Sequence, residues 1–152
     1  MGNFVLSKRS IQNLNGVSTD LQWIVHRAIN ISTIDFGVIE GLRTVERQKE
    51  LVAKGASKTM NSKHITGEAV DVLAYLGSRG SWELNLYDDI ANAFRIAAQE
   101  QGVGIRWGGA WNIPDITVHT DCSWMMDAYI DYSRARGKRP FIDAVHFELA
   151  HR

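Results

Sequence analysis

The sequence is poor in features that would place it in a specialised class of proteins. It has one cysteine, Cys122, so no disulfide can form within the chain. Its formal net charge is zero, with 17 basic and 17 acidic residues, which argues against a general nucleic-acid binder because neutralising phosphates needs a basic surplus. No apolar run approaches the roughly 18 residues that span a bilayer. We therefore expect neither nucleic acid nor a membrane anchor.

The first nine residues also lack the pattern of a secretory signal. Their apolar run precedes the charges and is shorter than the roughly 7–15 apolar residues such a signal needs. We therefore expect the protein to be made in the cytoplasm without a signal peptide. Any work outside the cytoplasm would then require a separate route of release.

Length and hydrophobic spacing predict one α+β domain over residues 1–152. Helices are expected over residues 7–16, 18–29, 44–54, 84–101 and 122–136. Strands are expected over residues 34–40, 68–76, 103–107 and 144–149, with a turn at 77–80. Because helices and strands mix without regular strand–helix–strand alternation, we expect a small, mostly antiparallel sheet with flanking helices.

The most informative stretch, residues 62–71, reads as half of a metal site. His64 and Asp71 are seven residues apart. A helix would separate them by ~10 Å along its axis, and a straight strand would point them to opposite faces. A bend at Gly67 removes the difficulty, with His64 in a loop and Asp71 inside the strand that follows.

A second fragment, residues 143–146, can supply the rest of the site. The final strand alternates apolar residues with His146 and Glu148, which predicts one core face and one polar face. Asp143 has the wrong parity for the polar face, so it must lie at the start of the strand or beside a bulge. Two histidines and one carboxylate are a donor set that a catalytic zinc uses when its fourth position is left to water.

Together these fragments match the pattern of a known family. Five residues fit the S-x-H-x-x-G-x-A-x-D pattern of zinc D-Ala-D-Ala-type metallopeptidases: Ser62, His64, Gly67, Ala69 and Asp71. Asp143 and His146 fit the acid-x-x-His element that follows it. Within that family, residues 4–149 most resemble phage endolysins of the L-alanyl-D-glutamate peptidase type, to which residues 40–44 and 106–109 are also similar.

The resemblance implies a Hedgehog/DD-peptidase-like fold and a zinc ion held by His64, Asp71 and His146. It also implies Asp143 as the catalytic acid/base and Arg43 as the residue that steadies the substrate carbonyl. The sequence departs from the family pattern in two places. Ala110 stands where many relatives have an acid, and residues 144–145 are Ala-Val where Gly-Pro is common.

Several of these residues have more than one interpretation. Glu148 rivals Asp143 as the acid/base because it shares a face with His146, and its alternative role is to orient that ligand by a hydrogen bond. Glu68 is a weaker candidate. Arg43 is either functional or a solvated surface residue.

The remaining candidates are also open to two readings. Ser62 either contacts substrate or holds its loop. Trp107, like Trp111 and Trp124, either lines a groove for substrate or packs in the core, as large aromatic residues more often do. His119 and Cys122 are interpreted as structural because no second ligand pair lies nearby.

Three functions are compatible with this pattern. The first is an endolysin: a zinc-dependent peptidoglycan endopeptidase that cleaves the L-Ala-D-Glu bond of murein stem peptides for host cell lysis. It would act as a monomer without a separate wall-binding module and reach periplasmic murein after holin-type release. The second is a D-Ala-D-Ala carboxypeptidase or dipeptidase. The third is a non-catalytic, zinc-stabilised binding module, against which Asp143 and the three-ligand pattern argue.

Overall fold

A computed structural model describes residues 4–150 of the chain. Its helices are α1 (Lys8–Asn13), α2 (Thr19–Ile31), α3 (Val45–Ala53), α4 (Leu84–Gln101) and α5 (Met125–Ala135), with a 3-10 helix at Ile116–Val118. Its strands are β1 (Asp35–Glu40), β2 (Ala69–Leu76), β3 (Arg79–Ser81), β4 (Ile105–Trp107) and β5 (His146–Leu149). In this part of the chain, no helix is long and apolar enough to cross a membrane.

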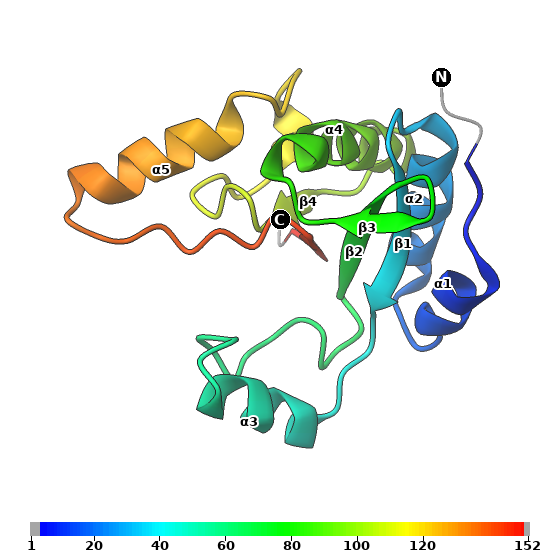
Figure 1. Cartoon of the computed structure of the whole chain (residues 1–152), viewed down its shortest axis with the longest axis horizontal. Coiled ribbons are helices and arrows are strands. Elements are labelled where there is room, and N and C mark those ends of the chain that lie inside the picture. Colours follow the sequence, from blue (N-terminus) through cyan, green and yellow to red (C-terminus); the bar gives the residue numbers. More distant parts are fainter. Residues whose placement is uncertain (1–3, 151–152) are drawn as a thin grey trace.

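The strands form one antiparallel sheet in the order β1-β2-β5-β4, and the short β3 pairs with β2. Helices α2 and α4 pack against each other beside the sheet (Figure 1). The predicted α+β fold, with a small antiparallel sheet and flanking helices, is therefore confirmed.

The hydrophobic core joins one face of the sheet to α2 and α4. Val70 and Phe147 are paired across β2 and β5 and are both fully buried. Phe94 of α4 stacks on Phe147, with ring centroids 4.0 Å apart, and Trp107 of β4 lies parallel to the same ring at 6.3 Å. Because side chains alternate along a strand, this packing places Asp71 of β2 and His146 and Glu148 of β5 on the opposite face.

Helix α3 and the loop that follows it lie beyond the end of β1 and the start of β2, away from the core helices (Figure 1). Thr44 caps α3, because its side chain accepts a hydrogen bond from the Arg47 amide. Ser7 caps α1 in the same way through the Ser10 amide. Both caps agree with the helix starts that the sequence predicts.

Several element boundaries differ from the prediction; for example, β4 begins at Ile105 and not at 103, and α1 ends at Asn13 and not at 16. Residues 77–78 form a two-residue turn, so residues 79–81 pair with β2 as β3 where the sequence indicated only a turn. Helix α5 begins at Met125 and not at 122, because the Cys122 amide donates to Asn92 Oδ1 and not within a helix. Strand β5 begins at His146 and not at 144, because residues 144–145 form a turn.

Candidate metal centre

The loop before β2 positions His64. Gly67 adopts a φ of +76°, and a Cβ there would lie 2.4 Å from the Gly16 carbonyl oxygen, so no larger residue fits this bend. The Gly67 carbonyl accepts a hydrogen bond from the Ser18 amide at 2.8 Å. This is the bend predicted between His64 and Asp71, and it returns the loop toward the sheet.

Strand register positions the other two candidate ligands. Asp71 of β2 lies directly opposite His146 of β5. On the other side of β2, a bulge between Val38 and Glu40 brings Glu40 opposite Asp71. Glu40 of β1, Asp71 of β2 and His146 of β5 therefore lie side by side on three neighbouring strands.

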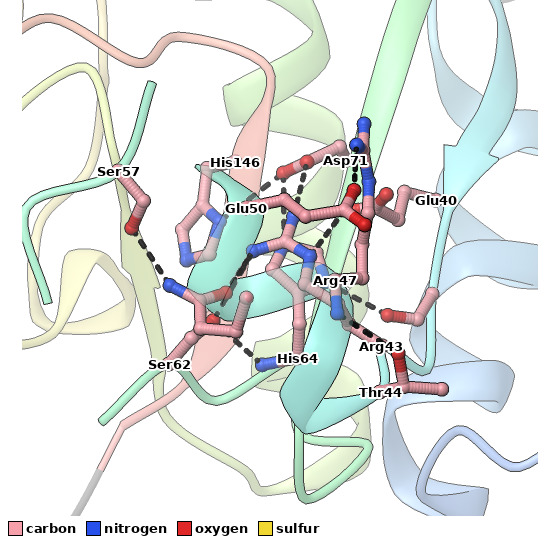
Figure 2. A network of polar contacts seen from close by, with 12 residues as sticks. Glu40, Arg43, Thr44, Arg47, Glu50, Ser57, Ser62, His64, Asp71 and His146 are labelled. Atoms are coloured by element: carbon pink, nitrogen blue, oxygen red, sulfur yellow. Dashed lines mark hydrogen bonds and ion pairs between the residues drawn. The ribbon is translucent and has the colours of Figure 1, made fainter. Parts of the chain in front are cut away.

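The hydrogen bonds of the two imidazoles define which nitrogen faces the centre. His64 Nδ1 donates to the Gly41 carbonyl at 2.8 Å, which leaves Nε2 facing Asp71 Oδ1 at 3.2 Å. His146 Nε2 donates to Glu148 Oε1 at 2.8 Å, which leaves Nδ1 3.1 Å from the same Asp71 oxygen. Figure 2 shows His64, Asp71 and His146 converging from the loop, β2 and β5.

These residues fit a metal ion. One ligand atom from each of His64, Asp71 and His146 lies within 4.8 Å of the others. Both histidines are buried, and each has its outer nitrogen fixed by a carbonyl or a carboxylate, as metal-binding histidines usually do. The three residues can therefore hold a divalent cation and leave a further coordination position open.

The electrostatics of the centre favour a cation. Burial alone would raise the pKa of Asp71, but hydrogen bonds from His146 and His64 outweigh it and hold that pKa far below its usual range. Burial alone would lower the pKa of His146, but hydrogen bonds from Asp71 and Glu148 raise it to about 9. The carboxylates around the two imidazoles therefore attract positive charge. A bound metal ion would supply that charge in place of a proton on His146.

Asp143 lies in the segment that leads into β5 and lines the same pocket as the candidate ligands. Burial raises the pKa of its carboxyl, and the neighbouring Asp71 raises it further. Within residues 4–150, no hydrogen bond or ion pair engages the Asp143 carboxylate. Its side chain is therefore free to exchange a proton with a bound molecule.

The glycine turn after β4 helps to hold Asp143 in this position, because Gly108 lies close to residues 143–146. Gly108 donates to the His146 carbonyl at 2.8 Å and accepts from the Asp143 amide at 2.9 Å. A Cβ on Gly108 would lie 2.2 Å from the Asp143 carbonyl oxygen. The Ala-Val departure at 144–145 leaves this arrangement intact, because the Val145 carbonyl still accepts from the Val72 amide at 2.9 Å.

Arg43 points into the site and is not a solvated surface residue. Its side chain is 8% exposed, and Nη2 lies 3.6 Å from Asp71 Oδ2. Glu40 accepts hydrogen bonds from its guanidinium (Figure 2), and Gln48 accepts another at 2.6 Å from Nη1. Neither Glu40 nor the buried Gln48 was among the site residues predicted from the sequence. Glu40 lies three residues before Arg43, and Gln48 lies five residues after it. This closeness along the chain is the sequence feature that could have pointed to both residues.

Ser62 holds its loop and also meets Arg43. Its hydroxyl oxygen accepts from the His64 amide at 3.2 Å and lies 3.5 Å from Arg43 Nη1. Glu148 is buried and engaged twice, by His146 and by Lys63 Nζ at 3.3 Å. Glu68 instead accepts from Thr66 and does not line the pocket.

Trp107 packs in the core, which is the second of the two interpretations that the sequence left open. It is fully buried, lies outside the pocket lining and donates from Nε1 to the Ala144 carbonyl at 2.8 Å. It therefore positions the turn before His146 from the core side. Trp111 does line the pocket, with its ring centroid 5.2 Å from that of His146. Ala110 is buried in the core and does not reach the pocket.

The pocket in front of the candidate ligands has a volume of about 680 Å³. One wall is the polar face of the sheet, and the others come from α3 with its following loop and from the segment before β5. A cavity of this size accommodates several residues of an extended peptide beside the metal centre.

Comparison with known proteins identifies the family. The model of the phage L-alanyl-D-glutamate peptidase family matches residues 1–150. The L-alanyl-D-glutamate peptidase of Escherichia phage T5 is 34% identical over 114 residues, which are 72% of this chain and 83% of that protein. The enzyme of that name from Listeria phage A118 is 29% identical over 107 residues, which are 68% of this chain and 37% of that protein.

A solved structure agrees with the sequence relatives. The structure of the Serratia marcescens L-Ala D-Glu endopeptidase ChiX is similar with a TM-score of 0.71 and 35% identity, over 96% of this chain and 90% of that one. The protein is therefore a peptidase, and the chain belongs to the phage L-alanyl-D-glutamate peptidase family.

Proposed function

We propose that the protein is a zinc-dependent endopeptidase that cleaves the L-Ala-D-Glu bond of peptidoglycan stem peptides. One observation carries the proposal: His64, Asp71 and His146 present one ligand atom each toward a common point, and Asp143 lines the same pocket. The choice of bond is supported by the names of the phage T5 relative and of the Serratia endopeptidase. The choice of zinc is supported by the two-histidine, one-carboxylate donor set.

In this proposal, Asp143 moves the protons. When bound, zinc would polarise the scissile carbonyl and lower the pKa of the attacking water to ~7. The Asp143 carboxylate then accepts the proton of that water and returns it to the leaving amine of the glutamate. Its raised pKa favours the first of these steps, because a carboxylate that binds a proton more readily is a stronger base toward the water.

Glu148 fits a different task in the same mechanism. Its carboxylate already accepts the N–H of His146 and pairs with Lys63. Such a carboxylate fixes the orientation of the imidazole and increases its basicity as a ligand. The proposal therefore assigns proton transfer to Asp143 and orientation of His146 to Glu148.

Arg43 would stabilise negative charge on the substrate. Its guanidinium is held in place by Glu40 and Gln48 and lies close to Asp71. A preorganised cation beside the metal centre stabilises the oxygen that becomes negative when water attacks the carbonyl. Ser62 would help to hold Arg43 in this position.

We also propose that the chain acts as a monomeric endolysin with one catalytic domain, after holin-type release to the cell wall. The phage origin of its relatives supports a role in host lysis. The single sheet and its single core support one catalytic unit over the described residues.

A murein digest tests the proposed reaction. Purified peptidoglycan is incubated with zinc-loaded protein, with and without a chelator, and the new peptide ends are identified by mass spectrometry. We expect C-terminal L-Ala and N-terminal D-Glu, none of either with the chelator, and far less of both with Asp143→Asn in the same time. Release of D-Ala alone would instead support the carboxypeptidase alternative.

A further inference from the structure

Arg106 lines the pocket from β4 and has no acidic partner. It lies opposite Glu148 in the strand register, but Glu148 is engaged by His146 and Lys63. Within residues 4–150, the Arg106 guanidinium forms no ion pair and donates one hydrogen bond, from Nη2 to the Trp111 carbonyl. Its Cζ also lies 5.2 Å from the centroid of the Trp111 ring. The contacts of Arg106 therefore position it without neutralising its charge.

The donors of Arg106 and Trp111 are incompletely used. Across residues 4–150, the buried side-chain nitrogens or oxygens without a partner are Arg106 Nε and Trp111 Nε1, and both residues line the pocket. Arg106 Nη1 also has no protein acceptor in this part of the chain, and it is not buried. Buried donors in native proteins are nearly always paired. Arg106 Nη1 is therefore the free donor that an acceptor from outside the chain can reach from the pocket.

The other cations near the metal centre are already committed. Arg43 is bound by Glu40 and lies beside Asp71, and Lys63 pairs with Glu148. Lys58 also lines the pocket, but it is exposed and lies over the Phe141 ring at 5.1 Å. Arg106 is consequently the best-placed cation to receive an anionic group of a bound molecule.

The distance of Arg106 from the metal centre suits an anionic group on the substrate residue next to the scissile bond. The Trp111 ring lies 5.2 Å from both the His146 ring and Arg106 Cζ, so these two are no more than about 10 Å apart. An extended peptide advances about 3.3–3.6 Å per residue. The glutamate of an L-Ala-D-Glu bond carries one carboxylate that belongs neither to the scissile bond nor to the continuing chain. That carboxylate falls within reach of a guanidinium at this distance.

We infer that Arg106, supported by Trp111, binds the free carboxylate of the glutamate residue on the leaving side of the scissile bond. This inference rests on the proposed function and deepens it by naming a residue that determines specificity. A guanidinium can pair two N–H groups with the two oxygens of a carboxylate, which a neutral side chain cannot reproduce. Arg106 thus distinguishes a glutamyl residue from an uncharged one after the alanine.

Two synthetic peptides test this role. One contains the L-Ala-D-Glu bond with its free carboxylate, and in the other that carboxylate is converted to a carboxamide. For the wild-type protein we expect kcat/KM to be on the order of 10- to 100-fold higher for the carboxylate peptide. Arg106→Gln should remove this preference mainly by raising KM for the carboxylate peptide, with little effect on the carboxamide peptide. Arg106→Lys should retain part of it.

Lys58→Gln is the matched control, because it also removes a cation that lines the pocket. It should leave the preference unchanged, and all variants should keep wild-type zinc content and melting temperature. Equal losses on both peptides in Arg106→Gln, or no loss on either, would overturn the inference. If the wild-type protein cleaves neither peptide, the proposed function fails. The ratio of the two binding constants, measured by calorimetry on the same proteins, then decides the role of Arg106.

Discussion

Neutralising Asp143 and Glu148 one at a time separates proton transfer from positioning of the metal. Within residues 4–150, no hydrogen bond or ion pair engages the Asp143 carboxylate, so Asp143→Asn removes the base without breaking a contact that holds a ligand. The loss of general acid–base catalysis is worth ~10²–10⁴ in rate. We therefore expect kcat to fall by that factor while zinc content and melting temperature stay at wild-type values.

Glu148→Gln should behave differently because its carboxylate makes two contacts. The amide oxygen of glutamine can still accept the N–H of His146, but the ion pair with Lys63 at 3.3 Å is lost and the remaining acceptor is weaker. We expect zinc affinity to fall about 10-fold, toward 100-fold at most. Because the base is untouched, turnover should return when free zinc is raised.

The assay is the initial rate of murein hydrolysis in zinc-buffered solutions, with zinc content measured on the same samples. Glu148→Gln should approach wild-type turnover at high free zinc, whereas Asp143→Asn should stay slow at every zinc concentration. An inactive, fully zinc-loaded Glu148→Gln together with an active Asp143→Asn would reverse the two assignments and refute the reasoning from their contacts.

Three further predictions concern the support of the site. Gly108→Ala should lower the free energy of unfolding by about 1–3 kcal/mol, measured by denaturant titration, because the new Cβ would lie 2.2 Å from the Asp143 carbonyl oxygen. Trp107→Phe should cost about 1–3 kcal/mol in the same assay, because the Ala144 carbonyl loses its buried donor. In the metal-free protein, the raised pKa of His146, about 9, stabilises the fold below its unfolded-state value of ~6.5. This stabilisation is lost as pH rises through 9, and apparent zinc affinity, measured by competition with a chelator, should rise over the same window.

The sequence predicted those parts of the site that follow from spacing along one segment. The parity of His146 and Glu148 placed both on the polar face of the final strand, and both lie there. The seven-residue spacing of His64 and Asp71 required a bend, and Gly67 provides it. Each of these conclusions depends on backbone geometry alone, which local sequence determines well.

The missed features depend on contacts between segments. Glu40 reaches Asp71 because a bulge shifts the register of β1, and no sequence pattern marks that bulge. Trp107 is in the core because its ring stacks on Phe147 and its Nε1 donates to the Ala144 carbonyl. Helix α5 begins late because Asn92 of another helix binds the Cys122 amide. Propensity and periodicity contain no information about such partners.

The zinc content of the purified protein and of its ligand variants tests the central claim most directly. Elemental analysis should find close to one zinc per chain in the wild-type protein and almost none in His64→Ala, Asp71→Ala or His146→Ala. The matched control is His119→Ala, which removes a histidine that packs on Trp124 outside the pocket lining and should keep its zinc. Full zinc content in His146→Ala, or a wild-type protein that hydrolyses murein without metal, would contradict the account.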